Sequence, residues 1–195
     1  MFIHEMFQQK PCVFSVEVFP PKKAGAAEET LYPVLRELCT LGPDYISVTY
    51  GAGGGTAGQS TAKIASYIKN GLHVEALAHL TCVNSTRVQV EETLTRLRED
   101  NVENVLALRG DINPDLPRRM DFLHASDLAK AIAQTGGFGV AGACYPEGHV
   151  ESPSLKADVE SLRYKAEAGV SHLITQLFFD NVSYYRFLNM ARKAG

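Results

Sequence analysis

Several features that mark large classes of protein are missing from this sequence. No apolar run approaches the roughly 20 residues that a membrane-spanning helix needs, and the polar N-terminal residues, among them Glu5 and Lys10, do not resemble a signal peptide. The formal net charge is −3, so no basic surface for nucleic acid is indicated. We therefore expect a cytoplasmic protein that binds neither membranes nor nucleic acids.

The usual motifs for metal ions are also missing. The four cysteines form no C-x-x-C pair, and no histidines stand at H-x-H or H-x-x-x-H spacing, so we predict no metal site. Metal ligation or a reactive thiol remains the alternative for the cysteines, but small apolar side chains buried in a reducing compartment are favoured. The cysteines are Cys12, Cys39, Cys82 and Cys144.

The sequence does contain a repeated alternation of apolar runs and segments with helical spacing. The strand-like runs, about 30 residues apart, are 13–19, 45–50, 75–81, 104–108, 139–145 and 172–179. The helical segments are 28–41, 59–69, 86–100, 126–135, 154–168 and 183–194, with Ser126-Asp127 as the expected cap of the fourth. Such alternation predicts repeated βα units.

Two α/β architectures are built from such units. An open doubly wound sheet is one, but no G-x-G-x-x-G follows the first run, and residues suited to chemistry stand at nearly every strand end. We favour a TIM (β/α)8 barrel, which has eight units and typically about 250 residues. We therefore expect residues 1–195 to be a single domain that supplies about six βα units and lacks the C-terminal part of the barrel.

Glu17 is the most prominent candidate for catalysis. It lies within the first strand-like run, between Val16 and Val18. A carboxyl group enclosed by apolar neighbours inside a barrel has a raised pKa, which suits a general acid. The equally weighted alternative is a carboxylate paired with a buried Lys or Arg.

Two other strand ends carry groups that suit an anionic ligand. Arg109-Gly110-Asp111 combines a planar donor fork, a residue that permits close backbone approach and a carboxylate. Taken alone, this tripeptide is better explained as a salt-bridged turn. Thr49-Tyr50 leads into the glycine-rich stretch 51–55, either a loop that contacts phosphate through backbone N–H groups or a surface loop. It lacks the Lys-Ser/Thr of a Walker site.

The remaining candidates are single polar side chains. His79 and His149 fit a hydrogen-bonded histidine or a donor to a ligand better than zinc ligands. Asp158 and Lys165 lie seven residues apart on one helix face, which is most often a solvated face. Gln176 is an amide inside an apolar strand, where a bound heterocycle or the backbone could satisfy it.

Seven segments in this order resemble the methylenetetrahydrofolate reductases, and the resemblance covers essentially the whole chain. They are 16–21 (VEVFPP), 47–52 (SVTYGA), 79–82 (HLTC), 106–111 (LALRGD), 125–128 (ASDL), 145–147 (YPE) with His149, and 175–180 (TQLFFD). The resemblance implies a (β/α)8 barrel that binds FAD at the carboxyl ends of its strands. It also implies reduction of 5,10-methylenetetrahydrofolate to 5-methyltetrahydrofolate with NADH or NADPH, a step that serves methionine synthesis.

The resemblance also assigns roles to residues. Glu17 matches the general acid, Asp111 a carboxylate near flavin and folate, and Gln176 a contact of nicotinamide and folate; all three are therefore expected catalytic and substrate-binding residues. Thr49 matches a nicotinamide-nucleotide contact. The positions that match FAD contacts are Tyr50, Ala52, His79, Arg109, Gly110, Asp111, Ala125, Tyr145, His149, Asp158 and Lys165.

The chain departs from the family pattern in places. Valines rather than aromatic residues flank Glu17, His124 precedes Ala125 where an aromatic residue is common, and Tyr164 stands where a basic residue can help hold the flavin nucleotide. Two other functions therefore stay open. One is a flavin-carrying barrel subunit of a larger electron-transfer complex, without direct NAD(P)H oxidation; the other is a non-catalytic barrel. We expect a homo-oligomer, with an electron-transfer subunit as a further possible partner.

Overall fold

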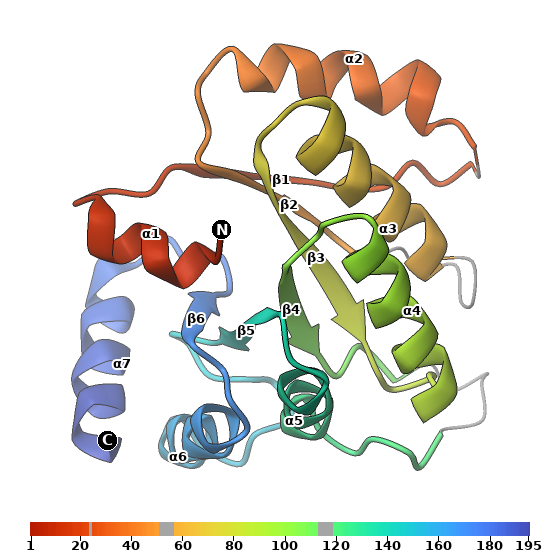
Figure 1. Cartoon of the computed structure of the whole chain (residues 1–195). Coiled ribbons are helices and arrows are strands. Elements are labelled where there is room, and N and C mark those ends of the chain that lie inside the picture. Colours follow the sequence, from red (N-terminus) through yellow and green to blue (C-terminus); the bar gives the residue numbers. More distant parts are fainter. Residues whose placement is uncertain (24, 51–56, 113–118) are drawn as a thin grey trace.

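The computed structural model describes residues 1–23, 25–50, 57–112 and 119–195 (Figure 1). Over these ranges six strands form one sheet in the order β1-β2-β3-β4-β5-β6. The strands are β1 (Ser15–Val18), β2 (Tyr45–Val48), β3 (Glu75–Thr81), β4 (Asn104–Leu108), β5 (Gly139–Cys144) and β6 (His172–Thr175). The helices are α1 (Ile3–Gln9), α2 (Ala27–Cys39), α3 (Ala57–Ser66) with a π-helical segment (Tyr67–Gly71), α4 (Arg87–Glu99), α5 (Ala125–Thr135), α6 (Leu155–Glu167) and α7 (Asn181–Ala194).

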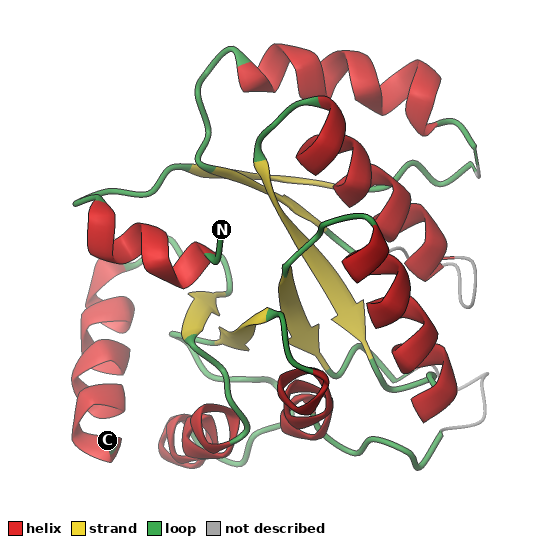
Figure 2. Cartoon of the chain, in the orientation of Figure 1, coloured by secondary structure: helices red, strands yellow, loops and turns green. Residues whose placement is uncertain are grey.

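The sheet is parallel throughout and curled. Each strand pairs in parallel with the next strand along the chain. Figures 1 and 2 show the strands turning from β1 round to β6, with helices α2 to α6 outside the curl. Helical crossovers between parallel neighbours bring the carboxyl ends of all the strands to one rim. The predicted α/β fold, with six consecutive βα units of a TIM-type barrel, is confirmed.

Alternation along the strands divides the apolar residues between two cores. Ile46 and Val105 point outward into the larger core beneath the helices. Leu77 and Leu106 point to the inner face, where Ile3 of α1 packs on them. Helix α1 therefore fills the inner face near the amino ends of the strands, and the opposite rim is left for a ligand site.

Helix α1, Gln176 and the start of α5 differ from the sequence-based predictions. No helix was expected at α1, because seven residues are too few for a clear helical pattern. Gln176 is not inside a strand: β6 ends with the pair Cys144–Thr175, and Gln176 follows it, exposed. The cap expected at Ser126-Asp127 was also wrong, because Asp127 Oδ2 accepts hydrogen bonds from the backbone N–H of Leu123 and His124, so α5 begins at Ala125.

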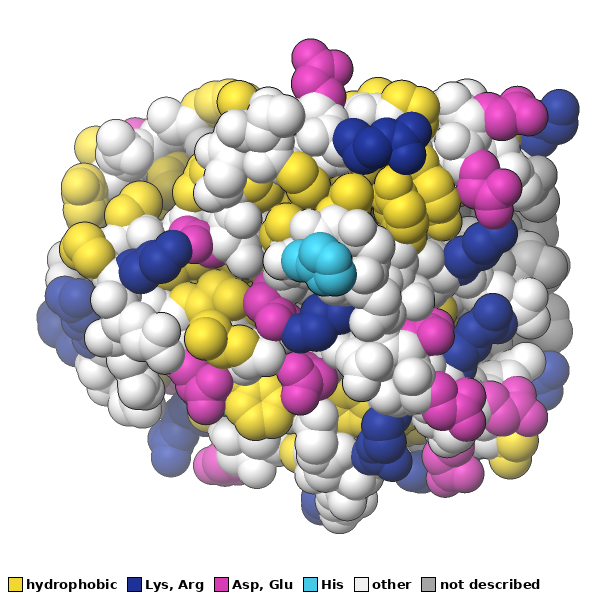
Figure 3. All heavy atoms as spheres, turned by 45° about the horizontal axis from the view of Figure 1, so that its top comes forward, with side chains coloured by type: hydrophobic (Ala, Val, Ile, Leu, Met, Phe, Trp, Pro, Cys, Tyr) yellow, Lys and Arg dark blue, Asp and Glu magenta, His cyan; other side chains and the backbone are white. Residues whose placement is uncertain are grey.

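The surface carries mixed charge. Acidic and basic side chains are interspersed over the face shown in Figure 3. Within the described ranges, no helix combines the length and the apolarity that crossing a membrane would require.

Candidate active site

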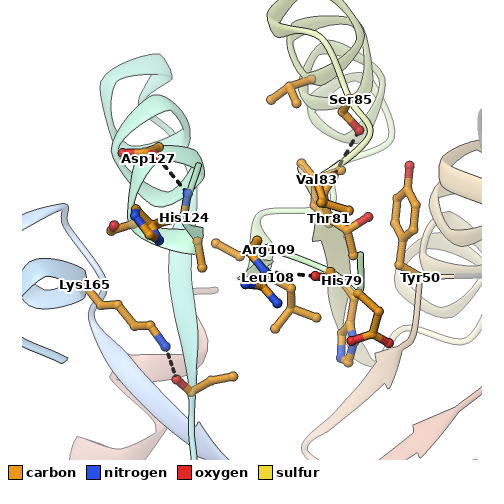
Figure 4. A pocket seen from close by; sticks show the side chains of 18 of the residues that line it. Tyr50, His79, Thr81, Val83, Ser85, Leu108, Arg109, His124, Asp127 and Lys165 are labelled. Carbon is orange, nitrogen blue, oxygen red and sulfur yellow. Dashed lines mark hydrogen bonds between the residues drawn. The ribbon is translucent and has the colours of Figure 1, made fainter. Parts of the chain in front are cut away.

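The carboxyl ends of the strands surround a cavity of about 1700 Å³, here called the rim cavity. Tyr50 follows β2, Arg109 follows β4 and Tyr145 follows β5, and all three line it. Figure 4 shows Tyr50 and Lys165 on opposite sides of the pocket, with His79 and Arg109 between them. Parallel strands account for this gathering, because residues far apart in sequence reach the same rim.

All the described residues that were expected to contact FAD line the rim cavity, and so does Thr49, the expected nicotinamide-nucleotide contact. They are Thr49, Tyr50, His79, Arg109, Gly110, Asp111, Ala125, Tyr145, His149, Asp158 and Lys165. Ala52 and the glycine-rich stretch 51–55 lie outside the described residues. Of the expected catalytic residues, Asp111 lines the cavity, whereas Glu17 and Gln176 are not among its lining residues.

Glu17 forms a polar cluster with Ser47 and His79 on the inner face of the sheet. The ladder pairs Glu17 of β1 with Ser47 of β2, and His79 belongs to β3. Ser47 Oγ donates a hydrogen bond to Glu17 Oε2 at 3.1 Å and lies 2.7 Å from His79 Nε2. His79 Nε2 is 3.4 Å from the same carboxylate oxygen. Glu17 is therefore linked to the rim cavity through His79, which lines it.

The expectation that apolar neighbours enclose Glu17 was wrong. Its side chain is 48% exposed. Strand β1 lies at an edge of the described sheet, and alternation turns Val16 and Val18, not Glu17, toward the larger core. Its hydrogen-bonded neighbour is a serine, so a buried Lys or Arg partner is not found among the described residues either.

His79 is neutral at pH 7. Its side chain is only 8% exposed, and burial lowers its pKa to about 4. The Glu17 carboxylate favours the charged imidazolium, but that carboxylate is half exposed and water screens it, so burial dominates. Because Ser47 Oγ donates to Glu17, it accepts from His79, which places the proton of the neutral ring on Nε2.

Arg109 is held in a two-pronged ion pair. Its Nη1 lies 2.6 Å from Glu151 Oε2, its Nη2 lies 2.7 Å from Glu151 Oε1, and its Nε donates to Gly110 O at 3.2 Å. The hydrogen-bonded Glu151 carboxylate raises the pKa of Arg109. Gly110 has φ +86°, and a Cβ at this position would lie 3.1 Å from Thr81 Cβ, so glycine lets the turn pack closely against β3.

Lys165 and Asp158 are half-buried and face the cavity, so the expectation of a solvated helix face was wrong. Lys165 Nζ donates to Ala143 O at 2.5 Å, and burial lowers the pKa of Lys165. Asp158 Oδ2 accepts from the backbone N–H of His149 at 3.1 Å, and the His149 ring meets Tyr145 edge-on with centroids 4.7 Å apart. Helix α6 thus fixes the loop after β5.

The composition of the rim cavity fits a large nucleotide cofactor. Its volume exceeds the roughly 300–1,000 Å³ of ordinary small-molecule sites. Arg109 and Lys165 supply positive charge for phosphate, and Tyr50 and Tyr145 supply aromatic surface for rings. Tyr164, which replaces an expected basic residue, lines the cavity and is 67% exposed. Among the described residues, no three His, Cys, Asp or Glu side chains come together as a metal site.

Two residues of the site were missed by the sequence analysis. Ser47 has a weak signal, because alternation places it on the same face as residue 45, but its pairing with Glu17 depends on strand register. Glu151 belongs to an irregular loop, and nothing in its neighbourhood predicts a partner 42 residues away.

The family model for methylenetetrahydrofolate reductase matches residues 2–195. The 5,10-methylenetetrahydrofolate reductase of Pectobacterium carotovorum subsp. carotovorum is 39% identical over 173 residues, which cover 89% of this chain and 57% of that protein. The Escherichia coli (strain K12) enzyme is 36% identical over 93% of this chain and 60% of its own length. Methylenetetrahydrofolate reductase (NADH) 1 of Arabidopsis thaliana is 35% identical over 99% of this chain and 35% of its own length. The chain thus spans about three fifths of the bacterial relatives.

Solved structures share the fold at low identity. An uncharacterized protein from Clostridium thermocellum that binds two copies of 5-methyl-5,6,7,8-tetrahydrofolic acid matches with a TM-score of 0.65 and 13% identity, over 99% of this chain and 64% of that one. A 2,3-dimethylmalate lyase matches with a TM-score of 0.63 and 12% identity, over 97% of this chain and 66% of that one. The match of the family model to nearly every residue, with curated relatives above 30% identity, shows that this chain belongs to the methylenetetrahydrofolate reductase family.

Proposed function

We propose that this chain belongs to a cytoplasmic enzyme that uses FAD to reduce 5,10-methylenetetrahydrofolate to 5-methyltetrahydrofolate, with NADH or NADPH as electron donor, for methionine synthesis. The observation that carries the proposal is the rim cavity, which collects every described residue that the family resemblance assigns to the flavin. The four cysteines are free thiols, which supports a reducing compartment.

Within this proposal the rim residues hold the cofactor. Arg109 and Lys165 face its phosphates and polar groups, and Tyr50, Tyr145 and His149 provide ring surface. When bound, the flavin supplies the transfer of a hydride from the nicotinamide to the folate. The protein supplies orientation and exclusion of water.

Glu17 and Asp111 serve the folate in this proposal. Glu17 acts as the general acid: it gives a proton to a folate nitrogen as the C–N bond of the five-membered ring breaks. The hydrogen bond from Ser47 Oγ fixes the orientation of this carboxylate, and the neutral His79 supports Ser47. Ring opening leaves a cationic iminium on the folate, which the Asp111 carboxylate at the rim stabilises. Gln176, exposed next to β6, contacts nicotinamide and folate in turn.

We also propose that residues 1–195 are part of one (β/α)8 domain. The curled sheet has β1 and β6 as its two edges within the described residues, and apolar side chains beside these edges are exposed, Phe19 by 70% and Phe179 by 91%. Two further strands between β1 and β6 would cover such surface.

Reconstitution of the full-length protein tests the function. We expect the protein to retain FAD after filtration, to oxidise NADH or NADPH without partner proteins and to form 5-methyltetrahydrofolate. Well-folded protein that retains no flavin contradicts the proposal. Flavin retention without nicotinamide oxidation indicates the subunit of an electron-transfer complex instead, and light scattering on the same sample reports the expected homo-oligomer.

Glu17→Gln separates the two half-reactions. Reduction of the bound flavin by NADH should stay near the wild-type rate, whereas reduction of the folate should fall by roughly 10²-fold or more, the usual contribution of a general acid. Stopped-flow absorbance of the flavin scores both steps. Equal losses in both half-reactions would mean that Glu17 has a structural role.

A further inference from the structure

Glu151 occupies the edge of Arg109 that is best suited to bind a phosphate. Both terminal nitrogens of the guanidinium are paired with the two oxygens of this carboxylate, at 2.6 and 2.7 Å, and Nε is paired with Gly110 O. Arginine binds phosphate through the same pair of parallel N–H···O hydrogen bonds from its planar guanidinium. An anionic ligand that enters the rim cavity therefore meets a guanidinium whose two terminal nitrogens are already paired with the negatively charged Glu151 carboxylate.

The side chains of Arg109 and Glu151 differ in how much of their surface is exposed to solvent. The Arg109 side chain is 21% exposed, whereas the Glu151 side chain is 50% exposed. The backbone of Glu151 is anchored, because its N–H donates to His149 Nδ1 at 3.1 Å. Because the Glu151 carboxylate is the more exposed partner, it is the group that an entering phosphate would displace from Arg109.

We propose that Glu151 is a built-in competitor of the cofactor phosphates for Arg109, and that it thereby sets how tightly the rim cavity holds FAD. This inference rests on the proposed function, since it needs a phosphate-bearing cofactor in the cavity. A phosphate that pairs with Arg109 must displace a partly exposed ion pair, which is a modest obstacle. Removing the Glu151 charge should tighten FAD binding by about fivefold, which corresponds to about 1 kcal/mol.

The test compares Glu151→Gln with the wild type in the full-length protein. The dissociation constants of FAD and of riboflavin, which lacks phosphate, are measured by flavin fluorescence. We expect about fivefold tighter FAD binding and less than about a twofold change for riboflavin. Glu147→Gln is the matched control: Glu147 is an exposed acid in the same loop, and Arg109 is paired with Glu151 instead. It should leave both constants within about twofold.

The outcomes separate the two proposals. Unchanged or weaker FAD binding by Glu151→Gln overturns the inference, and weaker binding would show that Glu151 holds Arg109 in position. Equal tightening of FAD and riboflavin also overturns it, because the effect would not depend on phosphate. If neither the wild type nor the variant binds FAD, the proposed function fails as well. Glu151→Ala repeats the comparison of FAD with riboflavin, so the result does not depend on how one variant folds.

Discussion

Replacing His79 with glutamine should remove a pH-dependent loss of stability that burial of the imidazole creates. The folded-state pKa of His79 is about 4, below the ordinary value of 6.5. As the pH falls below about 6.5, the unfolded chain binds a proton at this residue while the folded chain does not, so the free energy of unfolding decreases down to about pH 4. The shift corresponds to about 3 kcal/mol when complete and to about 2 kcal/mol at pH 5.

The assay is urea unfolding, followed by circular dichroism at about pH 7.5 and about pH 5, on the wild-type protein and on His79→Gln. Glutamine keeps a donor that can reach Ser47 but does not titrate. Other titrating groups, such as His172, are present in both proteins and cancel in the comparison. The wild type should lose about 2 kcal/mol more than the variant between the two pH values.

A second variant identifies the cause of the pH dependence. Ser47→Ala removes the hydroxyl next to His79 but leaves the imidazole buried, so it should keep the pH-dependent loss even though its stability is lower at both pH values. If the wild type and His79→Gln lose the same stability on acidification, burial does not control the charge of His79. A loss that disappears only in Ser47→Ala would assign the effect to the hydrogen bond.

Two further substitutions test the packing around the site by urea unfolding. Asn104→Ala should lower the free energy of unfolding by about 1–3 kcal/mol, because the buried Asn104 Oδ1 accepts from the backbone N–H of Ile3 at 2.8 Å and that donor would lose its partner. The control Asn189→Ala, at an exposed position, should change it by no more than about 0.5 kcal/mol. Equal losses in the two variants would argue that Asn104 does not anchor α1. Gly110→Ala should destabilise the protein more than Gly136→Ala. Both glycines have positive φ, which costs another residue about 1–3 kcal/mol of backbone strain, but of the two only Gly110 has other atoms within 4 Å of an added Cβ. Similar losses in the two variants would show that backbone strain alone matters.

Patterns within short segments predicted most of the fold. The bounds of β3 and β4 agree with the expected runs 75–81 and 104–108, because alternation and apolar composition act over a few residues. The predicted helical segment 154–168 also agrees with α6, and Ser154 Oγ caps this helix by accepting from the N–H of Ala157. Strands β1, β2 and β6 are shorter than their apolar runs, because a strand extends only as far as its backbone pairs with an adjacent strand. The last pairs are Val18 with Val48 and Cys144 with Thr175.

The sequence by itself determined the order of βα units and the kinds of residue at each strand end, and therefore which polar groups share the rim. Only the tertiary structure decided which groups touch. Strand register joined Ser47 to Glu17, and the path of an irregular loop brought Glu151 to Arg109. These contacts depend on chain segments that pack across long sequence separations, and the burial that neutralises His79 arises from the same packing. Local propensity carries no information about such contacts.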